Sequence, residues 1–415
     1  MEWKEVRLGD VCTRVCSGGT PKSTNLSYYG GEIPWLNTKE IDFNRIYSTE
    51  KTITDSGLNN SSAKWIAPNT VTVAMYGATA GKSCIVKVPM TTNQACCNLT
   101  INDEVADYEF VYYTLKNDYT TLASLANGGA QQNLNAQIIK DYVLKMPSLA
   151  DQRRIASILS SLDRKIELNN KINADLEEMA QAVFKNWLVD FEPFKDGKFV
   201  DSELGMIPEG WKVISLNEIL DNVSGYSYKG SELQSSNIAM ATIKNFERKG
   251  GFKTEGYKEI VISKKIKETQ FVNMFDVLVA HTDLTQNAEI VGNPAIVLSK
   301  GGYEKLIMSM DLTKVISKID GVTNGLLYCI LSTSRFKEHA LGYVNGTTVL
   351  HMSKKAVPEY TCAFPKDINQ IRDLCITLDS IYKRMAVTYD ENSRLSLLRD
   401  TLLPRLMSGE LEVPE

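Results

Sequence analysis

The feature that most constrains this chain is an uninterrupted helical pattern over residues 151–188, DQRRIASILSSLDRKIELNNKINADLEEMAQAVFKNWL. Apolar and small residues recur at alternating steps of three and four, the spacing of a helix face that packs against another helix. Neither glycine nor proline interrupts the pattern, and Pro147 and Ser148 precede it, where helix-start chemistry is expected. At about 1.5 Å per residue the helix would be roughly 57 Å long, more than the width of an ordinary domain. A helix of that length needs a partner.

A second pattern of the same kind lies near the other end of the chain and supplies that partner. It follows Pro365, as the first pattern follows Pro147. The face that the two helices share is expected to consist of Leu159, Leu162, Ile166, Leu176 and Val183 in the first helix and Leu374, Leu378, Ile381, Met385, Leu395 and Leu402 in the second.

The segments that precede the two helices repeat the same order of motifs. Trp3 and Trp211 each open a segment, and a glycine-containing turn follows both, SGGTPK in one half and SGYSYKG in the other. An apolar strand with a polar turn comes next in each (VTVAMYGATAGKS and DVLVAHTDLTQ), and a second polar turn (NGGAQQNL and NGTTVL) precedes the helix. The linker between the halves is short, so the two helices should run antiparallel.

The sequence therefore predicts an α+β fold with a pseudo-twofold internal repeat. Two globular α/β domains would be separated by two long helices that form an antiparallel coiled coil. The expected boundaries are a first domain at 1–148, the first helix at 149–188, a linker at 189–207, a second domain at 208–365, the second helix at 366–407 and a tail at 408–415.

Composition and charge exclude several classes of protein. A hydrophobic content of 43% is ordinary for a folded domain, and no apolar run has the length of a membrane span or a signal peptide, so we expect a cytoplasmic protein. The eight cysteines include no Cys-x-x-Cys pair, and three histidines accompany them, so no metal site is predicted. The net charge of −4 argues against coating of nucleic acid by bulk electrostatics. Nucleic-acid contacts would have to come from local patches.

No stretch has the residues of a convincing active site. The turn GATAGK has three residues between its glycines, where a phosphate-binding loop has four, so a tight turn with an exposed Lys82 is the better interpretation. The sequence GNPA resembles the start of an adenine-methyltransferase tetrapeptide, but no aromatic residue follows. His281 and Asp283 offer a catalytic pair, for which a hydrogen-bonded loop end is the simpler explanation. No catalytic residue is predicted.

What recurs instead is a set of polar turns rich in amides, hydroxyls, single cations and tyrosines. Asparagine and glutamine pair bidentately with adenine, lysine reaches guanine, and aspartate accepts from cytosine. Each turn alone is also explained as an ordinary solvated turn, but their recurrence in both halves favours base reading. The candidate DNA-binding residues are, in the first domain, Thr20, Lys22, Asn37, Lys39, Tyr76, Thr79, Lys82, Gln131, Gln132 and Asn133 and, in the second domain, Tyr226, Tyr228, Lys229, Lys244, His281, Thr282, Asp283, Gln286, Thr347 and Thr348.

These stretches also carry a family likeness that covers essentially the whole chain. The segments that carry it include WKEVRLGDVCTRVCSGGTPKST, IPWLNTKEI, VTVAMYGATAGKSCIV, NGGAQQNLN, LGMIPEGWKVISLNEI and SRLSLLRDTLLPRLMSGEL, together with the first long helix. In their doubled order they make the chain resemble the specificity subunit of type I restriction–modification systems.

The resemblance implies two target-recognition domains, each reading one half of a gapped double-stranded DNA sequence, held apart by the helix pair. It implies that two methyltransferase subunits dock on the helices and that restriction subunits join them. S-adenosylmethionine, ATP and Mg would be bound by those partners, and this chain would be non-catalytic. Asn169, Asn173 and Asn392 in the helix face would either fix the register of the pair or mark where a methyltransferase docks. The alternative function is a non-catalytic protein-interaction scaffold built on the coiled coil.

Overall fold

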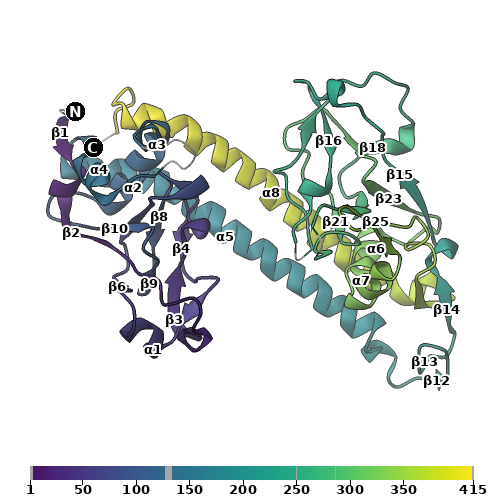
Figure 1. The fold of residues 1–415 in the computed structure, drawn as a ribbon. Coiled ribbons are helices and arrows are strands. Elements are labelled where there is room, and N and C mark those ends of the chain that lie inside the picture. The colour runs from purple at the N-terminus through teal and green to yellow at the C-terminus, as the bar shows by residue number, and fades with distance from the viewer. Residues whose placement is uncertain (1–2, 127–132, 249, 286, 414–415) are drawn as a thin grey trace. The chain divides into compact units, whose positions relative to one another are not determined.

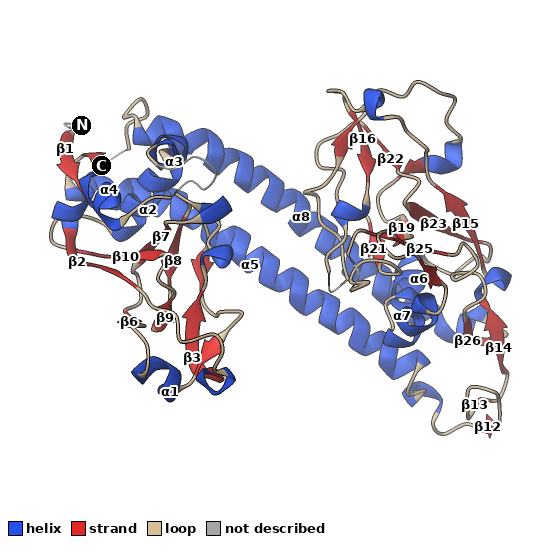
Figure 2. Ribbon diagram, in the orientation of Figure 1, coloured by secondary structure: helices blue, strands red, loops and turns tan. Residues whose placement is uncertain are grey.

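The computed structural model describes residues 3–126, 133–248, 250–285 and 287–413. The chain divides into two compact units, unit 1 (Met1–Ile166 with Leu395–Glu415) and unit 2 (Glu167–Arg394). Two long helices, α5 (Leu149–Leu188) and α8 (Arg372–Met407), contribute residues to both units (Figures 1 and 2). Among the described residues, no helix combines the length and the apolar run that a membrane crossing requires.

Unit 1 contains a five-stranded sheet in the order β2-β10-β7-β8-β4, a four-stranded sheet in the order β5-β3-β9-β6, and the pair β1-β11. Helix α2 packs on β7 and β8. The strands are β1 (Lys4–Arg7), β2 (Cys12–Ser17), β3 (Tyr29–Leu36), β4 (Arg45–Ile46), β5 (Thr52–Ile53), β6 (Trp65–Ile66), β7 (Val71–Ala74), β8 (Ser83–Val86), β9 (Met90–Thr92), β10 (Cys96–Ile101) and β11 (Val143–Met146). The shorter helices are α1 (Asp55–Asn59), α2 (Tyr108–Asn117), α3 (Tyr119–Ser124) and α4 (Ala136–Asp141).

Unit 2 contains four-stranded sheets in the orders β15-β23-β19-β21 and β17-β16-β22-β18, the pair β14-β26, a three-stranded sheet β20-β25-β24 and the pair β12-β13. Its strands are β12 (Phe199–Val200), β13 (Ile207–Pro208), β14 (Trp211–Ser215), β15 (Leu220–Ser224), β16 (Ile238–Ala241), β17 (Lys258–Glu259), β18 (Phe271–Val272), β19 (Val277–Ala280), β20 (Thr282–Asp283), β21 (Pro294–Ile296), β22 (Lys305–Met308), β23 (Leu312–Ser317), β24 (Val344–Asn345), β25 (Leu350–Met352) and β26 (Thr361–Pro365). Its shorter helices are α6 (Asn324–Leu331) and α7 (Ser334–Leu341).

The internal repeat is visible in the order of the strands. The order β2-β10-β7-β8 of unit 1 matches β15-β23-β19-β21 of unit 2, and β5-β3-β9-β6 matches β17-β16-β22-β18. Helix α6 packs on β19, β21 and β23, as α2 packs on the matching β7 and β8. The predicted repeat of two α/β domains is therefore confirmed.

The antiparallel pairing of α5 and α8 is confirmed by contacts inside each unit. In unit 2 the Asn169 amide donates to the Asn392 carbonyl oxygen at 2.9 Å, and the Thr388 hydroxyl donates to the Asn173 carbonyl oxygen. In unit 1 the Arg399 guanidinium bonds Asp163 at 2.8 Å. Residue numbers thus rise along α5 while those of the partners on α8 fall. The asparagines on the shared face bond across the pair in unit 2.

The burial of the expected apolar face varies along the two helices. Leu162, Ile166, Leu176, Val183 and Leu395 are half-buried, and Leu159, Leu374, Leu378, Ile381 and Met385 are buried. Near the end of α8 the buried residues are Leu403, Leu406 and Met407, while Leu402 is half-buried. A helix of 3.6 residues per turn drifts by about 20° for each seven-residue step, which moves Leu402 off the buried face.

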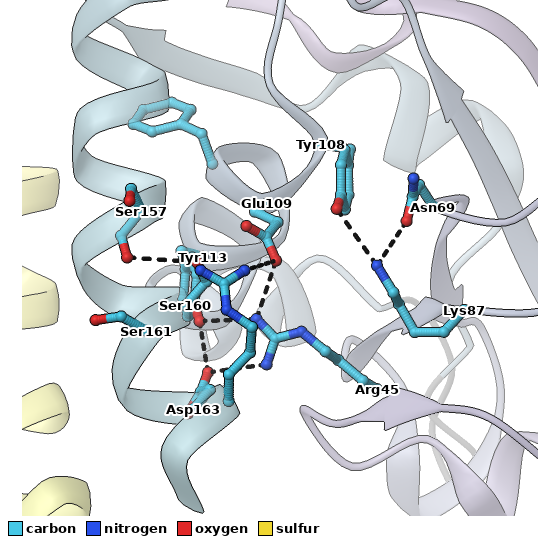
Figure 3. A network of polar contacts seen from close by, with 12 residues as sticks. Arg45, Asn69, Lys87, Tyr108, Glu109, Tyr113, Ser157, Ser160, Ser161 and Asp163 are labelled. Carbon is cyan, nitrogen blue, oxygen red and sulfur yellow. Dashed lines mark hydrogen bonds and ion pairs between the residues drawn. The ribbon is translucent and has the colours of Figure 1, made fainter. Parts of the chain in front are cut away.

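A buried network of charges ties β4 and α2 of unit 1 to α5 (Figure 3) and, through Arg399, to α8. Arg45, whose side chain is 3% exposed, bonds Glu109 at 3.1 Å and lies 3.9 Å from Asp163. The Tyr113 hydroxyl donates to Asp163 at 2.6 Å, and Arg399 donates to the second oxygen of that carboxylate at 2.8 Å. Two guanidinium groups and two carboxylates balance one another, so each buried charge has an opposite partner.

Asp163→Asn is expected to destabilise the protein by about 3 kcal/mol. The substitution removes one of the two buried carboxylates of the network and leaves the guanidinium groups of Arg45 and Arg399 in place. Urea unfolding of the full chain measures the change. The matched control is Asp400→Asn, which removes the other partner of Arg399, a carboxylate that is 57% exposed. The control should cost no more than about 1 kcal/mol. Equal costs for the two variants would contradict a stabilising role of the buried network.

Candidate nucleic-acid interface

The polar turns of unit 1 are joined to one another through main-chain hydrogen bonds. These bonds link the turns that carry Thr20, Asn37, Tyr76 and Asn133 through the segment 92–95. The donors and acceptors are Gly19 N to Thr92 O (2.8 Å), Asn93 N to Leu36 O (3.0 Å), Met75 N to Ala95 O (2.8 Å) and Leu134 N to Met75 O (2.8 Å). The structure therefore brings these turns together at one edge of the domain.

The side chains of this edge differ in how free they are to meet a ligand. Tyr76 is 42% exposed and forms a β-bridge with Asn133, which is also exposed. Lys22 and Lys39 are exposed, and so is Thr20, whose hydroxyl donates to the Gln94 side-chain oxygen. The Asn37 side chain caps a short helix by accepting from Lys39 N at 3.1 Å. The Thr79 hydroxyl donates to Thr38 O, and Lys82 pairs with Asp42 at 2.6 Å. Gln131 and Gln132 lie outside the described residues.

Unit 2 builds the same edge from the same main-chain bonds. The bonds are Tyr226 N to Met308 O (2.7 Å), Ser309 N to Ala241 O (2.9 Å), His281 N to Asp311 O (2.8 Å) and Met352 N to His281 O (2.8 Å). His281 thus occupies the place of Met75, and Thr282 occupies that of Tyr76. His351, which pairs with Thr282, occupies the place of Asn133.

The matching main-chain bonds identify His351 as a candidate site residue that the sequence interpretation missed. The sequence placed Thr347 and Thr348 opposite the Asn133 turn, but those exposed residues lie between the paired strands β24 and β25, and the matching position falls on exposed His351. A usable signal was present, since a polar residue followed by an apolar one occurs at both places, Asn133-Leu134 and His351-Met352.

Four of the residues predicted to contact bases in unit 2 are buried, which contradicts that role for them. Tyr226, His281, Thr282 and Asp283 are each more than nine-tenths buried. The Thr282 hydroxyl donates to the Asp311 carboxylate at 2.9 Å. Lys229, Lys244, Thr347 and Thr348 are exposed, Tyr228 is half-buried, and Gln286 lies outside the described residues.

Asp283 organises its own loop. Its carboxylate accepts from the backbone N–H groups of Thr285, Ile290 and Val291 and from the Thr285 hydroxyl, at 2.6–3.2 Å. Burial acts to raise the pKa of Asp283, but these donors outweigh it and hold the pKa below its usual value. With its oxygens occupied in this way, the carboxylate serves the loop as the simpler sequence interpretation predicted.

His281 has no acid–base partner in this arrangement. Its Nε2 atom is buried and has no hydrogen-bond partner among the described residues. Burial lowers the pKa of His281 to about 4, so the ring is neutral near pH 7. Nor do the residues that the structure describes include a group of three or more histidine, cysteine, aspartate or glutamate side chains placed to hold a metal ion.

In each unit, one glycine allows the first turn to pass very close to the backbone of the neighbouring strand end. A Cβ atom on Gly18 would lie 2.0 Å from the carbonyl oxygen of Thr92, and one on Gly225 would lie 2.0 Å from that of Ser309. No side chain fits at this distance, so glycine is required where the first turn crosses the neighbouring strand end.

Comparison with known proteins finds similarity along the whole chain. Residues 1–178 match the family described as "Type I restriction modification DNA specificity domain". The MjaIX specificity subunit of Methanocaldococcus jannaschii is 28% identical over 100% of this chain and 94% of its own length. The HindI specificity subunit of Haemophilus influenzae is 23% identical over 99% of this chain and 100% of its own length. The crystal structure of a type I restriction–modification S subunit from M. genitalium shares the fold, with a TM-score of 0.60 at 16% identity over 98% of this chain and 96% of that one.

The lowered pKa of His281 predicts a pH-dependent stability. Between about pH 6.5 and pH 4 the unfolded chain binds a proton at this histidine that the folded chain does not, so stability falls as the pH falls through that window. The loss should reach roughly 3 kcal/mol at pH 4. His281→Met, which installs the residue that unit 1 carries at this place, should remove that part of the pH dependence in urea unfolding. His351→Met, at an exposed position, should leave it in place, and a wild-type pH profile for His281→Met would contradict the assignment.

Proposed function

We propose that the chain is a DNA specificity subunit of a type I restriction–modification system and that each of its two globular domains recognises one half of a gapped DNA sequence. Support for two separate readers comes from the repeat, because each unit carries its own edge of polar turns built on matching main-chain bonds.

The observation that carries the proposal is that one backbone scaffold presents different side chains in the two units. Asn133 holds the position in unit 1 that His351 holds in unit 2, and both side chains are exposed. An asparagine pairs bidentately with adenine, whereas an imidazole offers one ring donor or acceptor to a base edge. Different groups at the same place read different bases, so the two half-sites should differ in sequence.

The proposal gives this chain no catalytic step. Two methyltransferase subunits and the restriction subunits would supply the chemistry, with S-adenosylmethionine, ATP and Mg bound by them. As the subunit that selects the DNA, the chain would act in the cytoplasm. A scaffold that binds only proteins is not favoured, because the relatives that match over the whole chain are specificity subunits.

The function is tested by expressing the chain with its methyltransferase subunits and sequencing the methylated sites. The expected result is a sequence with two defined parts separated by undefined base pairs. If the chain is only a scaffold, it does not determine which DNA sequence is methylated. That result, or a methylated sequence without a gap, would overturn the proposal.

Asn133→Ala and His351→Ala should each relax one half-site and leave the other unchanged. Loss of a base-edge contact is expected to reduce discrimination at the affected position by about 1–3 kcal/mol. Methylation-site sequencing of the two variant complexes measures this. Asn186→Ala, which removes an exposed asparagine of α5, is the matched control and should leave both halves intact. Relaxation of the same half by both variants would contradict the assignment of one reader to each domain.

A further inference from the structure

A segment of unit 2 beside the candidate reading edge differs in charge from its counterpart in unit 1. Residues 224–270 contain nine lysines and arginines and five acidic residues, whereas residues 17–66 contain five of each. Both segments start at the first glycine turn and contribute strands to matching sheets, β16 and β17 in one unit and β3 and β5 in the other. In a chain with a net charge of −4, the segment 224–270 is a local exception.

Glu232 holds two parts of this segment together. Its carboxylate accepts from the Tyr226 hydroxyl at 2.6 Å and from the backbone N–H of Lys229. It also accepts from the Ser263 hydroxyl at 2.7 Å and from Ser263 N at 3.0 Å. These donors, the tyrosine first, lower the pKa of Glu232 to about 2, so the group is ionised at neutral pH. The turn at 226–230 is thereby fixed next to residues 261–263.

Four lysines face outward along this junction. Lys229 lies in the turn, and Lys264 reaches back to it, with its ammonium 3.5 Å from the carbonyl oxygen of Ser227. Ile266 packs inward on the cluster of Tyr226, Met240, Ile260 and Ile307. Its neighbours Lys265 and Lys267 are exposed, as Lys229 and Lys264 are. Among the described residues, none of these four lysines has an ion-pair partner.

The turn that carries Lys229 is part of the reading edge itself. Tyr226 N donates to Met308 O, and Met310 N donates to Tyr226 O, so main-chain bonds connect the turn with the strand end that also supports His281. In unit 1 the candidate lysine Lys82 is neutralised by Asp42 at 2.6 Å, whereas Lys22 and Lys39 are exposed. Among the described residues, the larger group of exposed lysines without an ion-pair partner lies in unit 2.

We propose that Lys229, Lys264, Lys265 and Lys267 bind the sugar–phosphate backbone of DNA beside the half-site that the second domain reads. The inference rests on the proposed function and assigns these residues a positioning role within it. A lysine ammonium is a flexible point charge that suits phosphate oxygens and carries no sequence information. The salt-dependent part of binding therefore comes mainly from the second domain, and the first domain contributes less of it.

The test uses the full chain in complex with its methyltransferase subunits and a double variant, Lys264→Gln with Lys265→Gln. Each lost phosphate contact makes the slope of log affinity against log salt concentration less steep by about 0.9, so the double variant should be flatter by about 1.8. Affinity should fall to the same extent for DNA with and without the target. The methylated sequence should stay that of the wild type.

Two controls make the result specific. Lys264→Arg with Lys265→Arg keeps both charges and should keep the wild-type slope. Lys51→Gln with Lys64→Gln removes two exposed lysines from the neutral counterpart in unit 1 and should also keep it. Circular dichroism and thermal unfolding confirm that the variants are folded, and the single variant Lys265→Gln, with an expected change of about 0.9, provides a second measurement.

The outcomes separate this inference from the proposed function. An unchanged slope in the Gln variants, with a gapped methylated sequence retained, overturns the phosphate-binding role alone. A changed methylated sequence would mean that these lysines read bases and would also overturn it. A wild-type complex without sequence preference would overturn the proposed function instead.

Discussion

The need to bury one face of each long helix governs the structure of both units. An isolated helix gains little stability in water from its own hydrogen bonds, so α5 and α8 depend on tertiary packing. In unit 1, Ile155 and Leu159 of α5 share a core with Leu406 of α8 and with α2. In unit 2, Leu374 and Leu378 of α8 share a core with Ala180 of α5 and with α6. Polar residues that fall on the buried faces are tolerated because they pair.

The helices and the repeat could be predicted because their signals are local and occur twice. A period of 3.6 residues identifies a helix without knowledge of its partner, and two tryptophan-led segments of similar motif order reveal a duplication. The network of Arg45, Glu109 and Asp163 could not be predicted in this way. Its members come from a short strand, a domain helix and a long helix, and only the folded chain shows that they meet.

The candidate site could be predicted in part. The turns with Thr20, Asn37 and Tyr76 were identified from residue type and repetition, and main-chain bonds join them in the structure. Residue type failed for Asp283, because a carboxylate suited to a cytosine is equally suited to the backbone N–H groups of its own loop. Sequence alignment of the halves failed at His351, because the pairing of β24 with β25 shifts the matching position along the chain.

The reading edges are held by main-chain donors and acceptors and by one glycine in each unit, Gly18 and Gly225. Such bonds are the same for nearly every residue type, so exchanging an exposed side chain at Asn133 or His351 leaves the framework that supports it intact. Most enzymes lose stability or activity when their sites are altered, because the functional groups are also structural. Here main-chain atoms hold the edge together, and the exposed side chains are not needed for its stability. Under the proposed function, a chain built in this way acquires a new recognition sequence by single substitutions, without first passing through unfolded or unstable intermediates in its evolution.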